Sequence, residues 1–542
     1  MQKSRISNIL ASCISVIFAV IVLILTILSF KSHCKVDIYS VGNLRQLEIH
    51  RPIVYIGLAI AEFLILFIVY FTVSIILNRS KNSWKMVYII SLCIIGVVVA
   101  VCLFWIFFND TMPKLDQETL FHEARKLAGY DHEPYNVSYF ELYPRNKGLV
   151  LTMAFMLKIF GDTQISFRIL NVIGAVVLLF SVEMTVKKVW MKENLTLLVT
   201  VLLAFFYPII VYTSYLYGTL LAAAFSALGM YQAIRYYDKG SKKHVIISVI
   251  AFAFAIQMHQ SAAIVVIATI CSTIFFLHKR NWKKFCEYII LIILSIALVN
   301  GISGRVYEKK TGYETTEDAV PTLAYIYMGI SAEKGEEGPG SQDGSAYAIY
   351  KENEFDSHLT NQDALERIHK IVREYMTGER SPSFFVEKTK YQWLDPTFGA
   401  RKTIDTNESN FSGLKNSDQF IQFYNSSYRD LIFKLAVGNM IMVYMLNLFV
   451  MCVQLIKRKY DGLIFFTQIL LIGGFIFQLF WESMSRYCFA YFLWLIPGAA
   501  YGINIMYEII SASGREQARP AHRERRMSIM NEVHDMMKKK LG

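Results

Sequence analysis

The stretch KGLVLTMAFMLKIFG, from Lys147 to Gly161, decides the topology of this chain. It is apolar, but it is only about 14 residues long and Lys158 interrupts it. A helix needs roughly 20 apolar residues to cross the hydrocarbon core of a bilayer. We therefore predict that this segment forms a re-entrant or interfacial helix and does not span the membrane.

The basic residues of the loops support this prediction. Short loops that are rich in Lys and Arg face the cytoplasm. Six such clusters occur: Lys3 and Arg5; Arg79, Lys81 and Lys85; Lys187, Lys188 and Lys192; Arg235, Lys239, Lys242 and Lys243; Lys279, Arg280, Lys283 and Lys284; and Lys457, Arg458 and Lys459. All six lie on one side if residues 147–161 do not span. We therefore expect both termini, including the basic tail 512–542, in the cytoplasm.

Long apolar runs set the class of protein. The 542 residues are 54% hydrophobic and 18% charged, which is too little charge for a soluble protein of this size. Twelve runs are long enough to span: 9–30, 53–77, 84–108, 165–189, 195–212, 215–236, 244–260, 261–278, 284–303, 431–456, 462–481 and 486–510. We predict an all-α, multi-pass protein of the cell membrane. Its net charge of +12 then indicates topology and not nucleic-acid binding.

The runs divide the chain into five parts. We expect two extra N-terminal transmembrane helices in 1–83, a core in 84–303, an extracytoplasmic domain in 304–430, C-terminal transmembrane helices in 431–511 and the tail. Four segments face outward: 109–164, the turn 212–218, the large loop 304–430 and the turn 480–487. Within the large loop, NQDALERIHKIVREYM has helical spacing with Asn361 as its cap, and GPGSQDG is interpreted as plain loop.

The outward segments carry the candidate chemistry. The chain has no HExxH, CxxC, Walker A or GxSxG motif, and its cytoplasmic loops are too short for a nucleotide-binding domain. Polar residues at the outer span ends remain: Asp116, Glu118, Glu123, Arg145, Lys147, His259, Glu482 and Arg486. A carboxylate takes a proton from an acceptor hydroxyl, and cations stabilise a departing phosphate. This set therefore suits displacement of a phosphate from a lipid-linked sugar.

Ordered motifs carry a family resemblance. They are LDQETLFHEA, YPRNKGL and FGDTQISFRILNVIGA, then PIIVYTSYLYG and PTLAYIYMGI, then FFVEKTKYQWLDPTF and FWESMSRYCFAYFLWLIPGAAYG. In order and spacing they resemble the GT-C glycosyltransferases, specifically the protein O-mannosyltransferases and lipid A aminoarabinose transferases, nearest the Gram-positive bacterial type. The resemblance covers about residues 84 to 510. It implies a GT-C helical bundle with membrane-parallel helices in the first outer loop.

The resemblance also implies roles for individual residues. Asp116 matches the catalytic carboxylate of the first outer loop, and Arg486 matches a phosphate-contacting arginine near the last spans. Arg145 lies near the family's phosphate-binding lysine, with Lys147 as a rival. Further possible substrate-binding residues are Glu118, Tyr143, His259, Glu482 and Tyr487. The donor would be a polyprenyl-phosphate sugar, used without a cofactor.

Two departures from the family pattern concern the acidic residues. Many relatives have an acid in the second outer turn, where this chain has Gly218. Protein O-mannosyltransferases often have an Asp-Glu pair in the first loop, where this chain has Asp116 and Gln117. A divalent metal site is therefore not supported.

Each candidate has a plain structural alternative. Glu118 and Glu123 suit helix-surface acids, and Arg145 or Lys147 suits contact with lipid headgroups. His259 suits packing at the membrane boundary. The segment KYQWLDPTF suits either an acceptor groove or simple packing. Glu482 and Arg486, four residues apart, suit an ion pair on a helix end.

Three functions remain open at this point. The first is an inverting hexosyltransferase that moves a sugar from the lipid donor to an extracytoplasmic protein, glycolipid or cell-surface polymer. The second is a transporter or lipid flippase, although no repeat of two halves is visible in the sequence. The third is a polymerase or ligase of surface polysaccharide with another membrane fold. Asp116 separates them, because only the first requires it.

Overall fold

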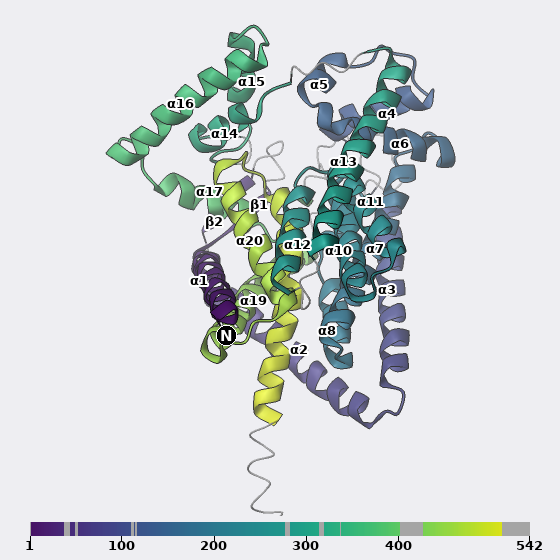
Figure 1. The fold of residues 1–542 in the computed structure, drawn as a ribbon, viewed down its shortest axis with the longest axis vertical. Helices are drawn as coiled ribbons and strands as arrows, with labels where there is room; N and C mark the ends of the chain where they lie inside the picture. Colours follow the sequence, from purple (N-terminus) through teal and green to yellow (C-terminus); the bar gives the residue numbers. More distant parts are fainter. Residues whose placement is uncertain are drawn as a thin grey trace, which may run out of the picture.

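The structure is a computed structural model that describes residues 2–36, 44–48, 52–109, 113, 116–276, 282–313, 319–335, 338–400 and 427–511. Helices dominate these residues, and many of them run along the long axis of the molecule (Figure 1). The membrane class predicted from composition agrees with this architecture.

The first half of the chain alternates long helices with short ones. Its elements are α1 (Gln2–Lys31), β1 (Ser32–Val36), β2 (Leu44–Glu48), α2 (Pro52–Arg79), α3 (Ser83–Phe108), α4 (Asp116–Ala128), α5 (Val137–Leu142), η1 (Pro144–Asn146), α6 (Lys147–Phe160), α7 (Ile165–Trp190), α8 (Glu193–Ala204), α9 (Pro208–Tyr212), α10 (Thr219–Lys239) and α11 (Lys242–Met258).

The second half adds the large loop and the C-terminal helices. Its elements are α12 (Ala262–Phe276), α13 (Trp282–Thr311), α14 (Thr322–Ser331), α15 (Ser345–Glu352), α16 (Ser357–Thr377), α17 (Ser383–Trp393), α19 (Ser427–Lys457), α20 (Gly462–Phe480), η4 (Ser485–Cys488) and α21 (Phe489–Leu493), after which residues 495–511 are again helical. The tail 512–542 lies outside the described residues.

The number of spans differs from the prediction. In the described part of the chain, eight helices are long and apolar enough to cross a membrane: Ile9–Lys31, Pro52–Arg79, Ser83–Phe108, Ile165–Trp190, Trp282–Thr311, Asp430–Lys457, Gly462–Phe480 and Ser485–Ser511. The other four predicted runs fall on α8 with α9, and on α10, α11 and α12. The structure therefore supports a multi-pass helical protein, but not a count of about twelve.

One predicted span is broken. The run 195–212 divides into α8, which ends at Ala204, and α9, which begins at Pro208. Proline lacks the backbone N–H that a continuing helix needs, but it fits the first position of a new one. Hydropathy alone does not register this break, because the residues on both sides are apolar.

The segment that opened the sequence analysis is helix α6. Leu149, Val150, Met153 and Leu157 are buried, whereas Phe155 and Ile159 are exposed. Gly161, at φ 92°, ends the helix after 14 residues. In Figure 1, α6 lies with α4 and α5 at the end of the bundle where the large loop also projects. A short helix with one buried face agrees with the prediction that it does not span.

Two details of the large loop correct the sequence predictions. Helix α13 continues to Thr311, beyond the predicted end of its span at residue 303. Helix α16 begins at Ser357, so Asn361 is not its cap. The cap is Asp356, whose carboxylate accepts hydrogen bonds from the amides of His358 (2.7 Å) and Leu359 (2.9 Å).

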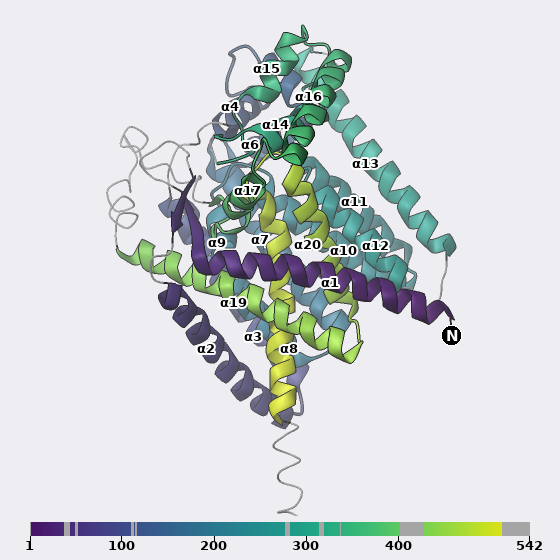
Figure 2. The same ribbon diagram turned by 90° about the vertical axis from the view of Figure 1, so that its left-hand side faces the viewer.

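The two N-terminal helices pack on the C-terminal helices. Helices α1 and α19 lie side by side and run across the long axis of the molecule (Figure 2). Helix α2 also contacts α19. A short antiparallel hairpin, β1 with β2, joins α1 to α2 and pairs Ser32 with Glu48. The sequence analysis did not predict this hairpin.

Three of the basic loops, 187–192, 235–243 and 457–459, meet at one end of the molecule. Lys188 binds Asp238 at 2.6 Å, joining the C-terminal ends of α7 and α10. The indole of Trp190 donates to Asp461 at 2.8 Å, joining α7 to the start of α20. Helices α4 to α6 and α14 to α17 occupy the opposite end (Figure 1). We call this the outer end, after the predicted orientation in the membrane.

A buried arginine fixes the outer end of the bundle. Arg168, in the first turn of α7, is 2% exposed. Its guanidinium donates to the Ile106 and Asn109 carbonyls at the end of α3, and to Gln164 Oε1 at 2.9 Å. The last carbonyls of a helix have no partner within it, and this arginine donates hydrogen bonds to two of them.

Replacing Arg168 with Met tests this role. The change removes the guanidinium donors from the α3 carbonyls and from Gln164, and we expect the unfolding free energy to fall by about 2 to 4 kcal/mol. The measurement is the thermal midpoint in detergent. Arg125→Met is the matched control, because Arg125 pairs with Asp162 in a partly exposed bridge worth about 1 kcal/mol. Equal midpoints for the two variants would contradict the assigned role.

Candidate functional site

Helix α4 presents Asp116 at its first position. The aspartate side chain is 44% exposed, so it remains accessible to a substrate. A carboxylate in the first turn of a helix also interacts favourably with the helix dipole. The next residue, Gln117, is buried and accepts a hydrogen bond from the Leu216 amide at 2.9 Å. This bond ties the start of α4 to the turn between α9 and α10.

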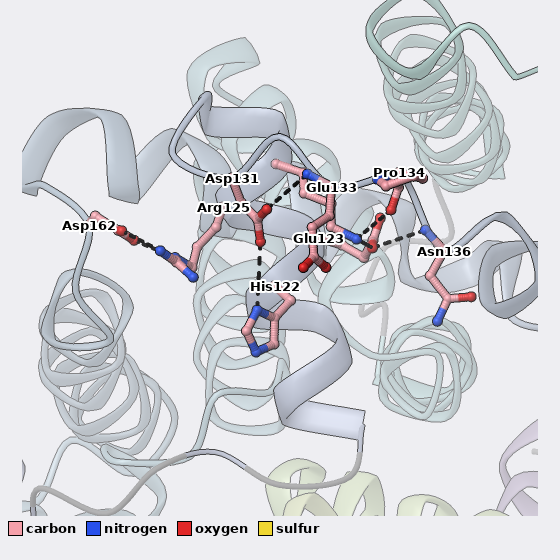
Figure 3. A network of polar contacts seen from close by, with 9 residues as sticks. His122, Glu123, Arg125, Asp131, Glu133, Pro134, Asn136 and Asp162 are labelled. Carbon is pink, nitrogen blue, oxygen red and sulfur yellow. Dashed lines mark hydrogen bonds and ion pairs between the residues drawn. The ribbon is translucent and has the colours of Figure 1, made fainter.

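A network of polar contacts holds the rest of α4 (Figure 3). Glu123 accepts from Lys126 Nζ at 2.8 Å and from the Asn136 amide at 3.0 Å. Lys126 also donates to the Pro134 carbonyl at 2.6 Å. Arg125 donates two bonds of 2.8 Å to Asp162. Glu123 is 1% exposed, so its interpretation as a helix-surface acid is wrong. Glu118 is exposed, as that interpretation expects.

Asn171 organises the turn that faces α4. Its side-chain amide donates to the carbonyls of Thr213 (3.3 Å) and Tyr215 (2.8 Å). Ser214 Oγ accepts from Asn109 Nδ2 at 2.9 Å. These buried bonds hold a non-helical backbone turn in one shape, and the turn presents Tyr215 and Tyr217 to Arg486.

The geometry of this turn explains why position 218 is a glycine and not an acidic residue. A Cβ atom at this position would lie 2.0 Å from the carbonyl oxygen of Met258, at the end of α11. Only glycine permits this approach of two backbones. An aspartate there would push α10 away from α11.

Arg486, from the C-terminal part of the chain, contacts Asp116 and the tyrosines of the turn. It lies in η4, and its guanidinium nitrogen Nη2 is 3.8 Å from Asp116 Oδ2. Nη1 donates to Tyr215 Oη at 2.9 Å. The guanidinium carbon also lies 5.0 Å from the ring centre of Tyr217 and 5.5 Å from that of Tyr487. Its side chain is only 11% exposed, so aromatic faces replace much of its water shell.

Arg145 approaches the site from η1. Its guanidinium lies 5.2 Å from the ring centre of Tyr325 and 5.8 Å from that of Tyr143, and it donates to Gln260 at 3.4 Å. Lys147 has a different neighbour, because its ammonium is 5.2 Å from the Tyr307 ring of α13. Of the two rivals, Arg145 is therefore the one beside the site aromatics.

The remaining candidates lie between these charges. Tyr487 Oη donates to Glu482 at 3.0 Å. The His259 ring lies 5.4 Å from the Tyr487 ring and 5.9 Å from the Tyr217 ring. Burial raises the pKa of the Tyr143 phenol, and the Asp116 and Glu482 carboxylates add to the rise. We call Asp116, Arg145, Glu482 and Arg486 the charge cluster.

The contacts of Glu482 and Arg486 correct one alternative. Residues 482–484 are not helical, so the two side chains do not form an i,i+4 pair on a helix. Arg486 faces α4 and the turn before α10, and Glu482 binds Tyr487.

A buried loop, residues 394–400, packs against η4 and binds its first residue. The Asp395 carboxylate accepts from the Thr397 amide (2.9 Å), the Gly399 amide (2.6 Å) and Ser485 Oγ (3.0 Å). Burial raises the pKa of this carboxyl, and these hydrogen bonds oppose the rise. Most residues of the segment KYQWLDPTF are therefore buried in the core, which agrees with the packing alternative. Ser485 directly precedes Arg486, so the loop helps to place that arginine.

Several site residues were not identified from the sequence. They are Tyr139, Tyr215, Tyr217, Gln260, Tyr325 and Trp481. A signal was present, since YTSYLYG and PTLAYIYMGI are dense in tyrosine. Tyrosine is also common at membrane interfaces, so composition alone does not separate a site tyrosine from a belt tyrosine.

The charge cluster can bind an anion next to an exposed carboxylate. Two arginines supply fixed donors in a partly dry, aromatic-lined setting, which suits a phosphate group. Within the described residues, no three His, Cys, Asp or Glu side chains gather as metal ligands would.

Comparison with known proteins gives the class. The sequence family described as conserved hypothetical integral membrane protein matches residues 6–504. The chain belongs to this family of integral membrane proteins. A comparison with curated proteins gives no significant match.

The link between Gln117 and the second turn can be tested directly. Gln117→Leu keeps the approximate volume but removes the acceptor of the buried Leu216 amide. Because an unpaired buried amide costs about 1 to 3 kcal/mol, we expect a lower thermal midpoint in detergent. Glu118→Gln, at the exposed neighbouring position, should leave the midpoint unchanged. No difference between the two variants would show that the link is dispensable.

Proposed function

We propose that this protein is a membrane glycosyltransferase that moves a hexose from a polyprenyl-phosphate donor to an acceptor on the outer side of the membrane. The observation that carries the proposal is the approach of Arg486 to Asp116, 3.8 Å apart although they come from distant parts of the sequence. An accessible carboxylate beside a largely desolvated guanidinium suits transfer from a lipid phosphate.

In the proposed reaction the acceptor hydroxyl attacks the anomeric carbon of the sugar. The bond between that carbon and the phosphate oxygen breaks, and its electron pair leaves with the polyprenyl phosphate. Asp116 takes the proton of the acceptor hydroxyl. Attack from the face opposite the phosphate inverts the anomeric configuration.

The two arginines would act on the leaving group. Negative charge on the bridging phosphate oxygen grows as the bond breaks, so cations at that point stabilise the transition state more than the ground state. Arg486 and Arg145 are held by aromatic rings and hydrogen bonds, and they therefore need little rearrangement. Exposed Glu118 has no part in this step.

The first test is release of polyprenyl phosphate. Purified protein in detergent is incubated with polyprenyl-phosphate hexoses and a cell-envelope extract as acceptor. We expect release by the wild type and a loss of about a hundredfold in Asp116→Asn, the typical scale for a lost acid–base group. Glu118→Gln, an exposed acid on the same helix, is the matched control and should retain activity.

Two outcomes would reject the proposal. Equal release by the wild type and Asp116→Asn would remove this aspartate from the reaction. No release from any donor, together with protein-dependent movement of a lipid or solute in vesicles, would favour a transporter.

The second test addresses the phosphate. Arg486→Gln keeps a polar side chain but removes the charge, and we expect kcat/KM for the donor to fall by about a hundredfold or more. Arg367→Gln, on the outer helix α16 and paired with Asp363 and Glu352, controls for loss of one positive charge. Similar kinetics for both variants would show that Arg486 does not act on the phosphate.

A further inference from the structure

A fully buried lysine lies in the outer helices and has no role in the proposed reaction. Lys388, on α17, is 0% exposed. Lysine is almost never fully buried unless its charge is paired, because removing an ammonium from water is costly. The position of this side chain therefore requires an explanation.

Three backbone carbonyls surround the ammonium group. Lys388 Nζ donates to Gly329 O at 2.5 Å, Trp481 O at 2.6 Å and Leu479 O at 3.0 Å. An ammonium has three N–H donors, so each donor has one acceptor. Gly329 belongs to α14, whereas Leu479 and Trp481 belong to the end of α20 and the residue after it. One side chain thus joins α14, α17 and α20.

The chemistry of a helix end explains why a cation suits this place. The last carbonyls of α20 have no partners within the helix and carry partial negative charge. Gln392, one turn after Lys388, donates to the Gln478 carbonyl at 2.9 Å. Helix α17 therefore caps α20 with two side chains.

Two glycines make room for the lysine. A Cβ atom at Gly329 would lie 2.4 Å from the Phe480 carbonyl oxygen, and one at Gly340 would lie 2.9 Å from Lys388 Nζ. Gly340 has φ +76°, a conformation that favours glycine, and its carbonyl accepts from the Ser483 amide at 2.7 Å. The segment GPGSQDG is therefore more than a plain loop, since it packs against the same turn.

The capped turn leads directly into the charge cluster. Trp481 stacks on Tyr325 with ring centres 5.4 Å apart, and Tyr325 lies under Arg145. Glu482 and Arg486 follow within five residues. Burial lowers the pKa of Lys388 to about 7, and the Glu482 carboxylate opposes that shift, so the lysine and the cluster are electrostatically connected.

We propose that Lys388 is a positioning residue: it holds the turn 481–486 against the outer helices so that Arg486 and Arg145 face the same anionic group. The outer helices α14 and α17 are then a structural part of the anion site, and not only a surface for the acceptor. That the anion is a lipid phosphate rests on the proposed function, whereas the positioning of the turn does not.

The test compares Lys388→Met with Lys370→Met, a matched loss of one lysine at an exposed position of α16. Amide hydrogen exchange in detergent reports on the turn, and binding of farnesyl phosphate reports on the anion site. For Lys388→Met we expect exchange in residues 481–487 to become at least about tenfold faster, with unchanged exchange in α7 and α10. We also expect about tenfold weaker binding of farnesyl phosphate. Lys370→Met should match the wild type in both measurements.

The outcomes separate the two proposals. Unchanged exchange in 481–487 of a folded Lys388→Met protein would overturn the positioning role. Faster exchange with no farnesyl phosphate binding by the wild type would support that role while rejecting the lipid-phosphate function. If Lys388→Met does not fold, amide hydrogen exchange of the wild type is compared with and without farnesyl phosphate. Protection of both 385–392 and 481–487 by the ligand would support the positioning role. Protection of 481–487 alone would overturn it.

Discussion

Pairing of buried backbone groups at the outer ends of the helices is the constraint on which the site depends. Several helices end there in buried surroundings, and side chains donate or accept hydrogen bonds at their last carbonyls or at the amides that follow. Arg168 serves α3, Asn171 and Gln117 serve the turn after α9, and Lys388 with Gln392 serves α20. An unpaired buried group costs about as much as a core substitution, so these contacts largely fix the backbone there.

The charge cluster follows from that constraint. Two of its members each follow or precede a residue that is held by a buried polar contact: Gln117 is held beside Asp116, and Ser485 is held by Asp395 beside Arg486. The two charged side chains Asp116 and Arg486 are paired less tightly, since their nearest atoms are 3.8 Å apart. A rigid frame with loosely paired charges can exchange a partner within the cluster for a ligand, because the frame does not depend on those pairs.

The architecture was predictable where it depends on composition and periodicity. Long apolar runs identified the eight helices of the described chain that are long and apolar enough to span, and the segment 147–161 forms a 14-residue helix, as its length predicted. The count of spans was not predictable in the same way. The break at Pro208 and the extension of α13 to Thr311 depend on local backbone geometry and packing, which hydropathy averages out.

The candidate site was predictable only in part. Charged residues at the outer ends of predicted spans stand out in an apolar sequence, and this signal identified Asp116, Arg145, Glu482 and Arg486. It could not distinguish Arg145 from Lys147, two residues apart, because their directions depend on which ring each one meets. The burial of Glu123 and Lys388 was equally hidden, since a charged side chain is expected to be solvated unless its partners are known.

The sequence by itself determined that this is a multi-pass helical membrane protein with charged residues between its apolar runs. The free energy of transferring apolar residues from water to the bilayer adds up along a helix. Composition therefore suffices for that conclusion. Only the tertiary structure decided which charges meet. Contacts between Asp116 and Arg486, or between Lys388 and the end of α20, join residues far apart in the chain. Their energies depend on distance and desolvation, neither of which a linear sequence contains.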